Sequence, residues 1–155
     1  MIKIIHKNLL DSKCDFIVHQ VNCQGAMGRG IALQVAKRFP HAASCYKEYV
    51  SSAKLHNTPL LGEILPVPIS GTKQMLIHLF GQEYYGGGVQ TSLSAVRNGL
   101  LKVKSMAELY GQSVALPYKM GCGLGGAHWD DVYKIITDVF SNTNIDIEIC
   151  EYERG

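Results

Sequence analysis

Two glycine-rich segments constrain this sequence most, because each lies between a strand-like run and a helix-like run. The first, Val21–Ala32, reads VNCQGAMGRGIA, and the second, Leu116–Gly126, reads LPYKMGCGLGG. Glycine lets the backbone turn sharply and expose its N–H groups, and a helix that begins beside such a turn favours a negative charge. Each segment is therefore expected to bind an anion such as phosphate. Two such segments in one chain favour a diphosphate held between them over a single phosphate.

The runs on either side of these segments predict an α/β protein. Short apolar, β-branched runs are typical of strands, and they occupy Ile2–His6, Asp15–Val21, Glu63–Pro68, Met75–Phe80, Ser113–Leu116 and Ile145–Glu151. Helical spacing covers Ile31–Phe39, ended by Pro40, and then Ala42–Ala53, Thr91–Tyr110 and Trp129–Asn142. Strands that alternate with helices predict a layered α/β sandwich. No linker or repeat divides the sequence, so residues 1–155 are expected to form a single domain.

Charge and cysteine content narrow the class of protein further. The formal net charge is only +2 at pH 7, so direct nucleic-acid binding is not expected. No apolar run approaches the ~20 residues that a membrane-spanning helix needs. The five cysteines are odd in number and lack Cys-x-x-Cys spacing, which favours neither a disulfide framework nor a zinc site. We therefore expect a cytoplasmic protein with no membrane contact, metal or cofactor.

The familiar phosphate-binding motifs do not fit the two glycine segments. A Walker-type loop ends in Gly-Lys-Ser/Thr, and neither segment has that ending. The pattern Gly25-x-x-Gly28-x-Gly30 inverts the order of the dinucleotide fingerprint, and the acidic residue expected after a second strand is missing. A different family of phosphate-binding proteins is therefore indicated.

The paired segments resemble the two ligand loops of the macrodomains, which bind ADP-ribose. Within that family, the strings Met27–Ala32 and Gly121–Leu124 are most similar to the branch of terminal ADP-ribose protein glycohydrolases and DNA ADP-ribosyl glycohydrolase antitoxins. The resemblance implies a three-layer α/β/α sandwich with a mixed central sheet. It also implies that the ligand is ADP-ribose or a derivative, or an ADP-ribosylated macromolecule.

The resemblance also implies which residues form the ligand site. Asn22 is expected beside the distal ribose, and the two loops are expected to offer backbone N–H groups to the two phosphates. The ligand-binding residues implied in this way are Asn8, Leu9, Val21, Asn22, Gly25, Met27, Gly28, Arg29, Gly30, Ile31, Ala32, Gly121, Cys122, Gly123, Leu124, Gly125 and Tyr152.

The adenine end departs from the family pattern. Many macrodomains place an aspartate after the first strand, where this sequence has Asn8, whose amide oxygen accepts a hydrogen bond without a charge. The alternative is that Asn8 only starts a turn. The position that often carries an aromatic side chain matches Cys150, so Tyr152 is the expected stacking residue.

The catalytic residues depart from the family pattern too. The glycohydrolases of this branch use a lysine after the strand that matches Met75–Phe80, where this sequence has Gln82, and one subgroup uses an aspartate where it has Gly125. Glutamine cannot form a Schiff base, so a lysine-dependent mechanism is not supported. Asn22 could instead position the ribose hydroxyls or a water. His19 is a further acid–base candidate, with a core histidine as the alternative. Gln82, which stands in place of the family lysine, is the third candidate catalytic residue.

Two functions remain open from the sequence. The first is hydrolysis of an ADP-ribose derivative, namely ADP-ribose 1″-phosphate, O-acetyl-ADP-ribose or an ADP-ribosylated target. The second is a non-catalytic ADP-ribose reader, which the missing lysine favours. A nucleic-acid-binding module is disfavoured by the low charge and by the lack of an aromatic stacking platform.

Overall fold

The computed structural model describes residues 1–152 and contains one six-stranded mixed sheet in the order β1-β6-β5-β2-β4-β3. The strands are β1 (Ile2–His6), β2 (Phe16–Asn22), β3 (Ile64–Pro68), β4 (Met75–Gln82), β5 (Val114–Pro117) and β6 (Ile147–Glu151). Every neighbouring pair is parallel except β3 with β4, which is antiparallel.

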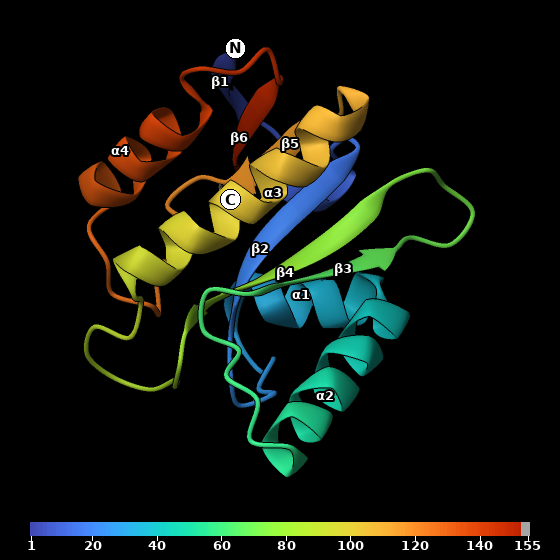
Figure 1. The fold of residues 1–155 in the computed structure, drawn as a ribbon, viewed down its shortest axis with the longest axis vertical. Coiled ribbons are helices and arrows are strands. Elements are labelled where there is room, and N and C mark those ends of the chain that lie inside the picture. Colours follow the sequence, from blue (N-terminus) through green and yellow to red (C-terminus); the bar gives the residue numbers. More distant parts are fainter. Residues whose placement is uncertain (153–155) are drawn as a thin grey trace.

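Helices cover both faces of this sheet, as Figure 1 shows. The α-helices are α1 (Gly30–Arg38), α2 (Pro40–Leu55), α3 (Leu93–Tyr110) and α4 (Trp129–Phe140), and a short 3-10 helix, η1, spans Leu9–Asp11. Helices α1 and α2 lie on one face, and α3 and α4 lie on the other. The expected three-layer α/β/α sandwich with a mixed sheet is therefore confirmed. None of the helices in residues 1–152 is long and apolar enough to cross a membrane.

Two apolar clusters form the core, one on each face of the sheet. Along β2, alternate side chains enter opposite clusters: Ile17 and Val21 pack under α1 and α2, while Phe16 and Val18 pack under α3 and α4. A strand that is covered on both faces needs apolar residues at successive positions. The continuous apolar runs in the sequence at β2 and β4 follow from this burial.

The two edge strands carry prolines and exposed charged side chains. Strand β3 contains Pro66 and Pro68, which lack a backbone N–H and are tolerated in strands mainly at an edge. Strand β1, at the opposite edge, exposes Lys3 and about half of Ile4. Charges and prolines at sheet edges discourage pairing with a second sheet.

Several helix boundaries differ from the sequence prediction by one or two residues. Pro40 does not simply end the first helix; α1 ends at Arg38, and Pro40 is the first residue of α2, where its missing N–H costs nothing. Helix α3 begins at Leu93 rather than Thr91, because the Ser92 side chain caps it by accepting from the Ala95 N–H. The 3-10 helix η1 was not predicted.

The parallel arrangement decides where a ligand can bind. Strands β1, β6, β5, β2 and β4 run in the same direction, so their carboxyl ends lie at one edge of the sheet. In α/β sheets ligands bind beyond that edge. Both glycine-rich segments follow strands that end there, since the first follows β2 and the second follows β5.

Candidate functional site

The first glycine loop, residues 22–29, is held in shape by the buried side chain of Asn22. The Asn22 Oδ1 accepts from the N–H groups of Gln24 (2.9 Å) and Ala26 (3.3 Å), and its Nδ2 donates to the Ala26 carbonyl (2.9 Å). The Tyr46 hydroxyl, from α2, donates to the Asn22 carbonyl and to Oδ1 at 2.6 and 2.9 Å. One amide side chain therefore sets the curvature of the whole loop.

That curvature leaves a row of backbone donors unused. None of the N–H groups from Met27 to Ala32 donates to another group in the described part of the chain, and the first intrahelical bond of α1 runs from Leu33 to Arg29. Gly30 adopts a φ of +58°, which glycine tolerates best. A helix N-terminus with free N–H groups and no side-chain cap is suited to an anion.

The second glycine loop, residues 119–127, folds back on itself in short turns. The N–H groups of Cys122, Gly126 and Ala127 donate to carbonyls within the loop. The N–H groups of Gly123, Leu124 and Gly125, which lie between them, have no acceptor in residues 1–152. This loop therefore presents a second row of donors.

Packing requires a glycine at position 125. A Cβ there would lie 2.2 Å from Thr91 Oγ1 and 2.5 Å from the Gly121 carbonyl oxygen. A Cβ on Gly123 would meet nothing within 4 Å. The sequence predicts that the glycines allow sharp turns and exposed N–H groups, and the structure adds close packing as a further reason at Gly125.

The two loops are neighbours and share a support. An added Cβ on Gly30 would lie 3.9 Å from a methyl of Leu124. The segment 82–91 bonds to both loops, because its Glu83 carbonyl accepts from Cys23 N–H (3.1 Å) and its Thr91 N–H donates to the Gly125 carbonyl (3.0 Å). The two donor rows therefore flank one region at the carboxyl edge of the sheet.

A cavity of about 320 Å³ lies next to these loops. Of the predicted ligand residues, Asn8, Leu9, Ile31 and Tyr152 line it. Its other lining residues are Leu10, Gln34, Pro117, Tyr118, Lys119, Cys150 and Glu151. Tyr118 and Lys119 were not among the predicted site residues, although both follow β5 at the carboxyl edge, and this position is the signal that could have identified them.

Two residues of the predicted adenine end have different surroundings. The Asn8 side-chain oxygen accepts from the Leu10 N–H at 3.0 Å and caps η1, as the turn alternative predicted. Tyr152 is 56% exposed and free to pack on a flat ligand. Tyr118 instead packs edge-on against Trp129 with ring centroids 5.0 Å apart.

Some of the predicted ligand residues could offer only their backbone to a ligand. The side chains of Val21 and Met27 are buried in the core under α1 and α2, so they cannot touch a ligand at the loops. Gly25, with a φ of +83°, packs beside Val50 of α2. The remaining predicted positions are Gly28, Arg29, Ala32, Gly121 and Cys122, which lie on the loops or in the first turn of α1.

His19 lies in the core and not at the ligand edge, which corrects its interpretation as an acid–base group. It is 1% exposed, and its Nε2 lies 2.8 Å from Nδ1 of the buried His78. The His78 Nε2 lies 2.9 Å from the Ala42 carbonyl, which can only accept, so the proton order runs from His19 through His78 to Ala42. Burial lowers the pKa of His78 to about 4 and that of His19 well below its usual value, so both are neutral.

Gln82 is tied into a hydrogen-bond network. Its Nε2 donates to the Tyr84 carbonyl at 2.7 Å, and its Oε1 accepts from Gln20 Nε2 at 2.9 Å. Both polar atoms of the amide therefore already have partners, which leaves Gln82 poorly suited to direct catalysis.

Burial favours the protonated form of the two thiols in the loops. Burial raises the pKa of Cys23 to about 12, and it also raises the pKa of Cys122. A thiol that stays protonated at neutral pH is a weak nucleophile. No group of three or more histidine, cysteine or acidic side chains in residues 1–152 is arranged to hold a metal.

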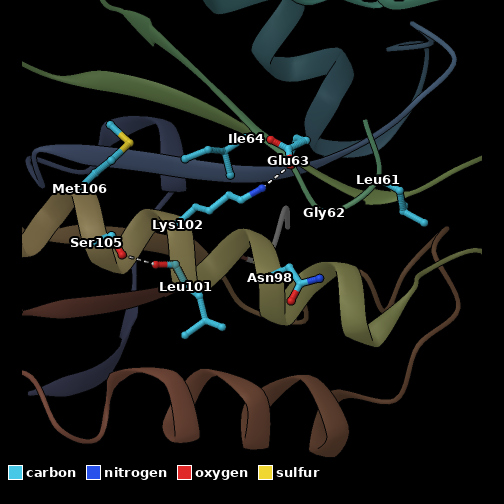
Figure 2. Close-up of a pocket in the computed structure, with 9 residues that line it drawn as sticks. All are labelled: Leu61, Gly62, Glu63, Ile64, Asn98, Leu101, Lys102, Ser105 and Met106. Atoms are coloured by element: carbon cyan, nitrogen blue, oxygen red, sulfur yellow. Dashed lines mark hydrogen bonds and ion pairs between the residues drawn. The ribbon is translucent and has the colours of Figure 1, made fainter. Parts of the chain in front are cut away.

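A second cavity, of about 650 Å³, lies between the segment before β3 and α3 (Figure 2). The Lys102 ammonium pairs with the Glu63 carboxylate across it. None of its lining residues belongs to either glycine loop. It is larger than the cavity beside the loops but presents no comparable row of free backbone donors.

Comparison with known proteins reveals one matching family. The family model described as "Macro domain" matches residues 18–136, which include both glycine loops.

Individual relatives share this similarity. A DNA ADP-ribosyl glycohydrolase of Mycobacterium tuberculosis is 28% identical over 137 residues, covering 86% of this chain and 37% of that protein. An ADP-ribose 1″-phosphate phosphatase of Saccharomyces cerevisiae is 30% identical over 113 residues, covering 69% of this chain and 62% of that protein. The solved macrodomain of Mycobacterium tuberculosis DarG superposes with a TM-score of 0.82 at 25% identity, covering 100% of this chain and 99% of that one. This chain thus spans little more than a third of the first relative and under two thirds of the second.

Proposed function

This chain belongs to the Macro domain family, and we propose that it binds ADP-ribose and hydrolyses an ADP-ribose derivative. The observation that carries the proposal is the pair of free N–H rows, at Met27–Ala32 and Gly123–Gly125, on adjacent loops. Backbone donors held in place by the fold bind an oxyanion without further reorganisation.

The rest of the ligand fits the space beside the loops. The 320 Å³ cavity has apolar walls from Leu9, Ile31 and Cys150, with Tyr152 at its rim. Such a cavity suits a flat base, because aromatic and apolar side chains bury its faces. The proposed order is base in the cavity, diphosphate between the loops and the distal ribose beside Asn22.

Asn22 is the proposed positioning residue for the reacting end. Its Nδ2 carries a second hydrogen beyond the one donated to Ala26. That hydrogen could be donated to a ribose hydroxyl or to an attacking water held by the phosphates. Asn22 has no proton to exchange at neutral pH, so its contribution is orientation and not acid–base chemistry.

Hydrolysis is supported by the activities named for the relatives, which are an ADP-ribosyl glycohydrolase and an ADP-ribose 1″-phosphate phosphatase. The substrates proposed for this chain are ADP-ribose 1″-phosphate, O-acetyl-ADP-ribose and an ADP-ribosylated macromolecule. The odd number of cysteines supports a reducing compartment, and we propose the cytoplasm.

A non-catalytic ADP-ribose reader is the second candidate. One observation favours it: the side chains placed where catalysis is expected are an amide, Gln82, with both polar atoms bonded, and a buried histidine, His19. Neither can exchange a proton with a bound ligand as the structure stands.

Two measurements test these proposals in turn. Calorimetry should give clearly tighter binding for ADP-ribose than for ADP or NAD, and equal or absent binding of all three would defeat the ligand assignment. A panel should then follow phosphate release from ADP-ribose 1″-phosphate, deacetylation of O-acetyl-ADP-ribose, and release of ADP-ribose from modified protein and DNA. Turnover of any of these supports the hydrolase, and binding without turnover would leave the reader.

A further inference from the structure

A chain of side-chain hydrogen bonds runs beneath the second glycine loop. Gln20 Nε2, from β2, donates to Thr91 Oγ1 at 2.8 Å and to Gln82 Oε1 at 2.9 Å. The Thr91 hydroxyl then donates to the Gly121 carbonyl at 2.9 Å. The Thr91 side chain therefore bonds the sheet on one side and the loop on the other.

The direction of this chain is fixed by its far end. Gln82 Nε2 donates to the Tyr84 carbonyl, so Gln82 Oε1 faces Gln20 and can only accept. Gln20 must then present its NH₂ group to both Gln82 and Thr91. The Thr91 hydroxyl, which accepts from Gln20, uses its one hydrogen for Gly121. The network has one self-consistent arrangement, and that arrangement ends on the loop.

Tight packing holds the same residues in place. Added Cβ atoms on Gly81 and Gly121 would lie 2.5 and 2.8 Å from Gln20 Oε1. That oxygen is buried and accepts no hydrogen bond in residues 1–152. Leaving a buried acceptor unpaired is unfavourable, so the position of the Gln20 amide is set by its two donated bonds and by this close packing.

We propose that Thr91 and Gln20 are positioning residues that hold the free N–H groups of Gly123–Gly125 where the second phosphate and the distal ribose bind. This inference rests on the proposed binding of ADP-ribose and adds to it the residues that place the second loop. Thr91 acts through Gly121, two residues before the free N–H groups, and through its own N–H, which donates to the Gly125 carbonyl. Neither residue touches the ligand.

AMP and ADP-ribose should depend differently on the second loop, because they occupy different parts of the proposed site. AMP carries a base and one phosphate, which occupy the cavity and the first loop. ADP-ribose adds the second phosphate and the distal ribose, which need the second loop. Loosening the second loop therefore lowers the affinity for ADP-ribose and leaves the affinity for AMP unchanged. General destabilisation of the fold lowers both affinities.

The experiment compares Thr91→Ala with Thr91→Ser by calorimetry against ADP-ribose and AMP, with thermal unfolding recorded for each variant. Serine keeps the hydroxyl and alanine removes it, while both lack the γ-methyl, so their difference isolates the hydrogen bonds. Thr137→Ala, on α4, is the matched control, since it loses a side-chain bond to the Lys134 carbonyl away from the loops. Gln20→Met is a second variant, of similar length and unable to donate, for the case in which Thr91→Ala does not fold.

Thr91→Ala is expected to bind ADP-ribose about tenfold more weakly, which corresponds to the loss of about one hydrogen bond to a charged group. AMP affinity should stay within about twofold, and Thr91→Ser and Thr137→Ala should match the wild type. Equal weakening of both ligands, or a serine variant as weak as the alanine variant, would overturn the positioning role. Failure of the wild type to bind ADP-ribose would instead overturn the proposed function.

Discussion

The two glycine loops both present free backbone N–H groups, but different contacts hold the two loops in shape. The first loop is shaped mainly from within, since Asn22 bonds to Gln24 and Ala26 only two and four residues away. The second combines short backbone turns with support from outside, by Thr91, which is 30 residues away from Gly121, and by Gln20, which is 71 residues away from Thr91. A local support is encoded in the motif itself, whereas a distant one exists only after the sheet has formed.

This difference has a consequence for mutations. The first loop should fail as a unit when one residue is changed, because a single amide makes most of its bonds. A single substitution in the second loop should have a smaller effect, because side-chain hydrogen bonds, backbone hydrogen bonds and glycine packing all contribute to its shape. Four predictions test that contrast, from the largest expected effect to the smallest.

Asn22→Ala should have the largest effect. It leaves two backbone N–H groups and the Ala26 carbonyl without partners in a partly buried position, and we expect the free energy of unfolding to fall by about 3 kcal/mol. ADP-ribose affinity should fall by roughly a hundredfold because the free N–H row is no longer aligned. Urea unfolding and calorimetry measure the two quantities.

The control for this change is Asn98→Ala, at an exposed position on α3. It should alter neither stability nor affinity by a measurable amount. If Asn22→Ala reduced turnover while affinity and stability stayed at the wild-type level, the loop-shaping role would be wrong and a purely catalytic role would be favoured.

Gly125→Ala should destabilise the second loop by about 2 kcal/mol, because the new Cβ overlaps Thr91 and Gly121 and forces the backbone to move. Gly123→Ala is the matched variant in the same loop, where the new Cβ meets nothing within 4 Å. It should change the unfolding free energy by less than about 0.5 kcal/mol. Equal stability of the two variants, measured by urea unfolding, would show that packing against Thr91 does not constrain the loop.

Acidification should weaken the support of the first loop. Tyr46, which holds Asn22, lies beside His78 with ring centroids 5.2 Å apart. Burial lowers the pKa of His78 from 6.5 to about 4. The unfolded chain therefore binds protons that the folded chain does not, so this stability is present above pH 6.5 and is lost as pH falls toward 4.

The expected slope is about 1.4 kcal/mol per pH unit for His78 between pH 6 and pH 4.5. Urea unfolding across this range measures it, and the double variant His19→Gln with His78→Gln should flatten the slope. The control variant His56→Gln, which replaces an exposed histidine, should retain the wild-type slope. A double variant with an unchanged slope would place the pH dependence elsewhere.

Tyr152→Ala should have the smallest effect, because it changes the base end and leaves both loops intact. Tyr152 lines the cavity and is 56% exposed, so the loss of its ring should lower the affinity for ADP-ribose by about fivefold. Tyr110→Ala, at an 81% exposed tyrosine on α3, is the control. Inorganic pyrophosphate, which has no base, should bind both variants equally; an effect of Tyr152→Ala on pyrophosphate would mean that Tyr152 influences the loops.

The contrast between the loops also explains what the sequence could predict. The strands and helices follow from local apolar spacing: in the predicted strand Ile145–Glu151, the side chains of Ile147 and Ile149 alternate with Glu148 and are buried. The two glycine segments follow from local composition. The role of Pro40 was missed because proline both stops one helix and starts the next, and the pattern alone does not distinguish the two.

Long-range contacts were beyond the sequence prediction. His19 was a plausible acid–base group until the structure placed it against His78, 59 residues away, in the core. The sequence predicts Thr91 only as the start of a helix, because nothing in the neighbouring residues indicates that its hydroxyl bonds to the Gly121 carbonyl. A local pattern specifies an element, but which elements meet depends on the whole sheet.

The central claim is that free N–H groups of both loops bind one diphosphate, and an amide NMR titration with ADP-ribose tests it most directly. The account predicts that the amide signals of Gly28, Gly30, Gly123 and Gly125 shift together and follow a single binding curve. Signals that move in only one loop, or that follow two different affinities, would contradict it.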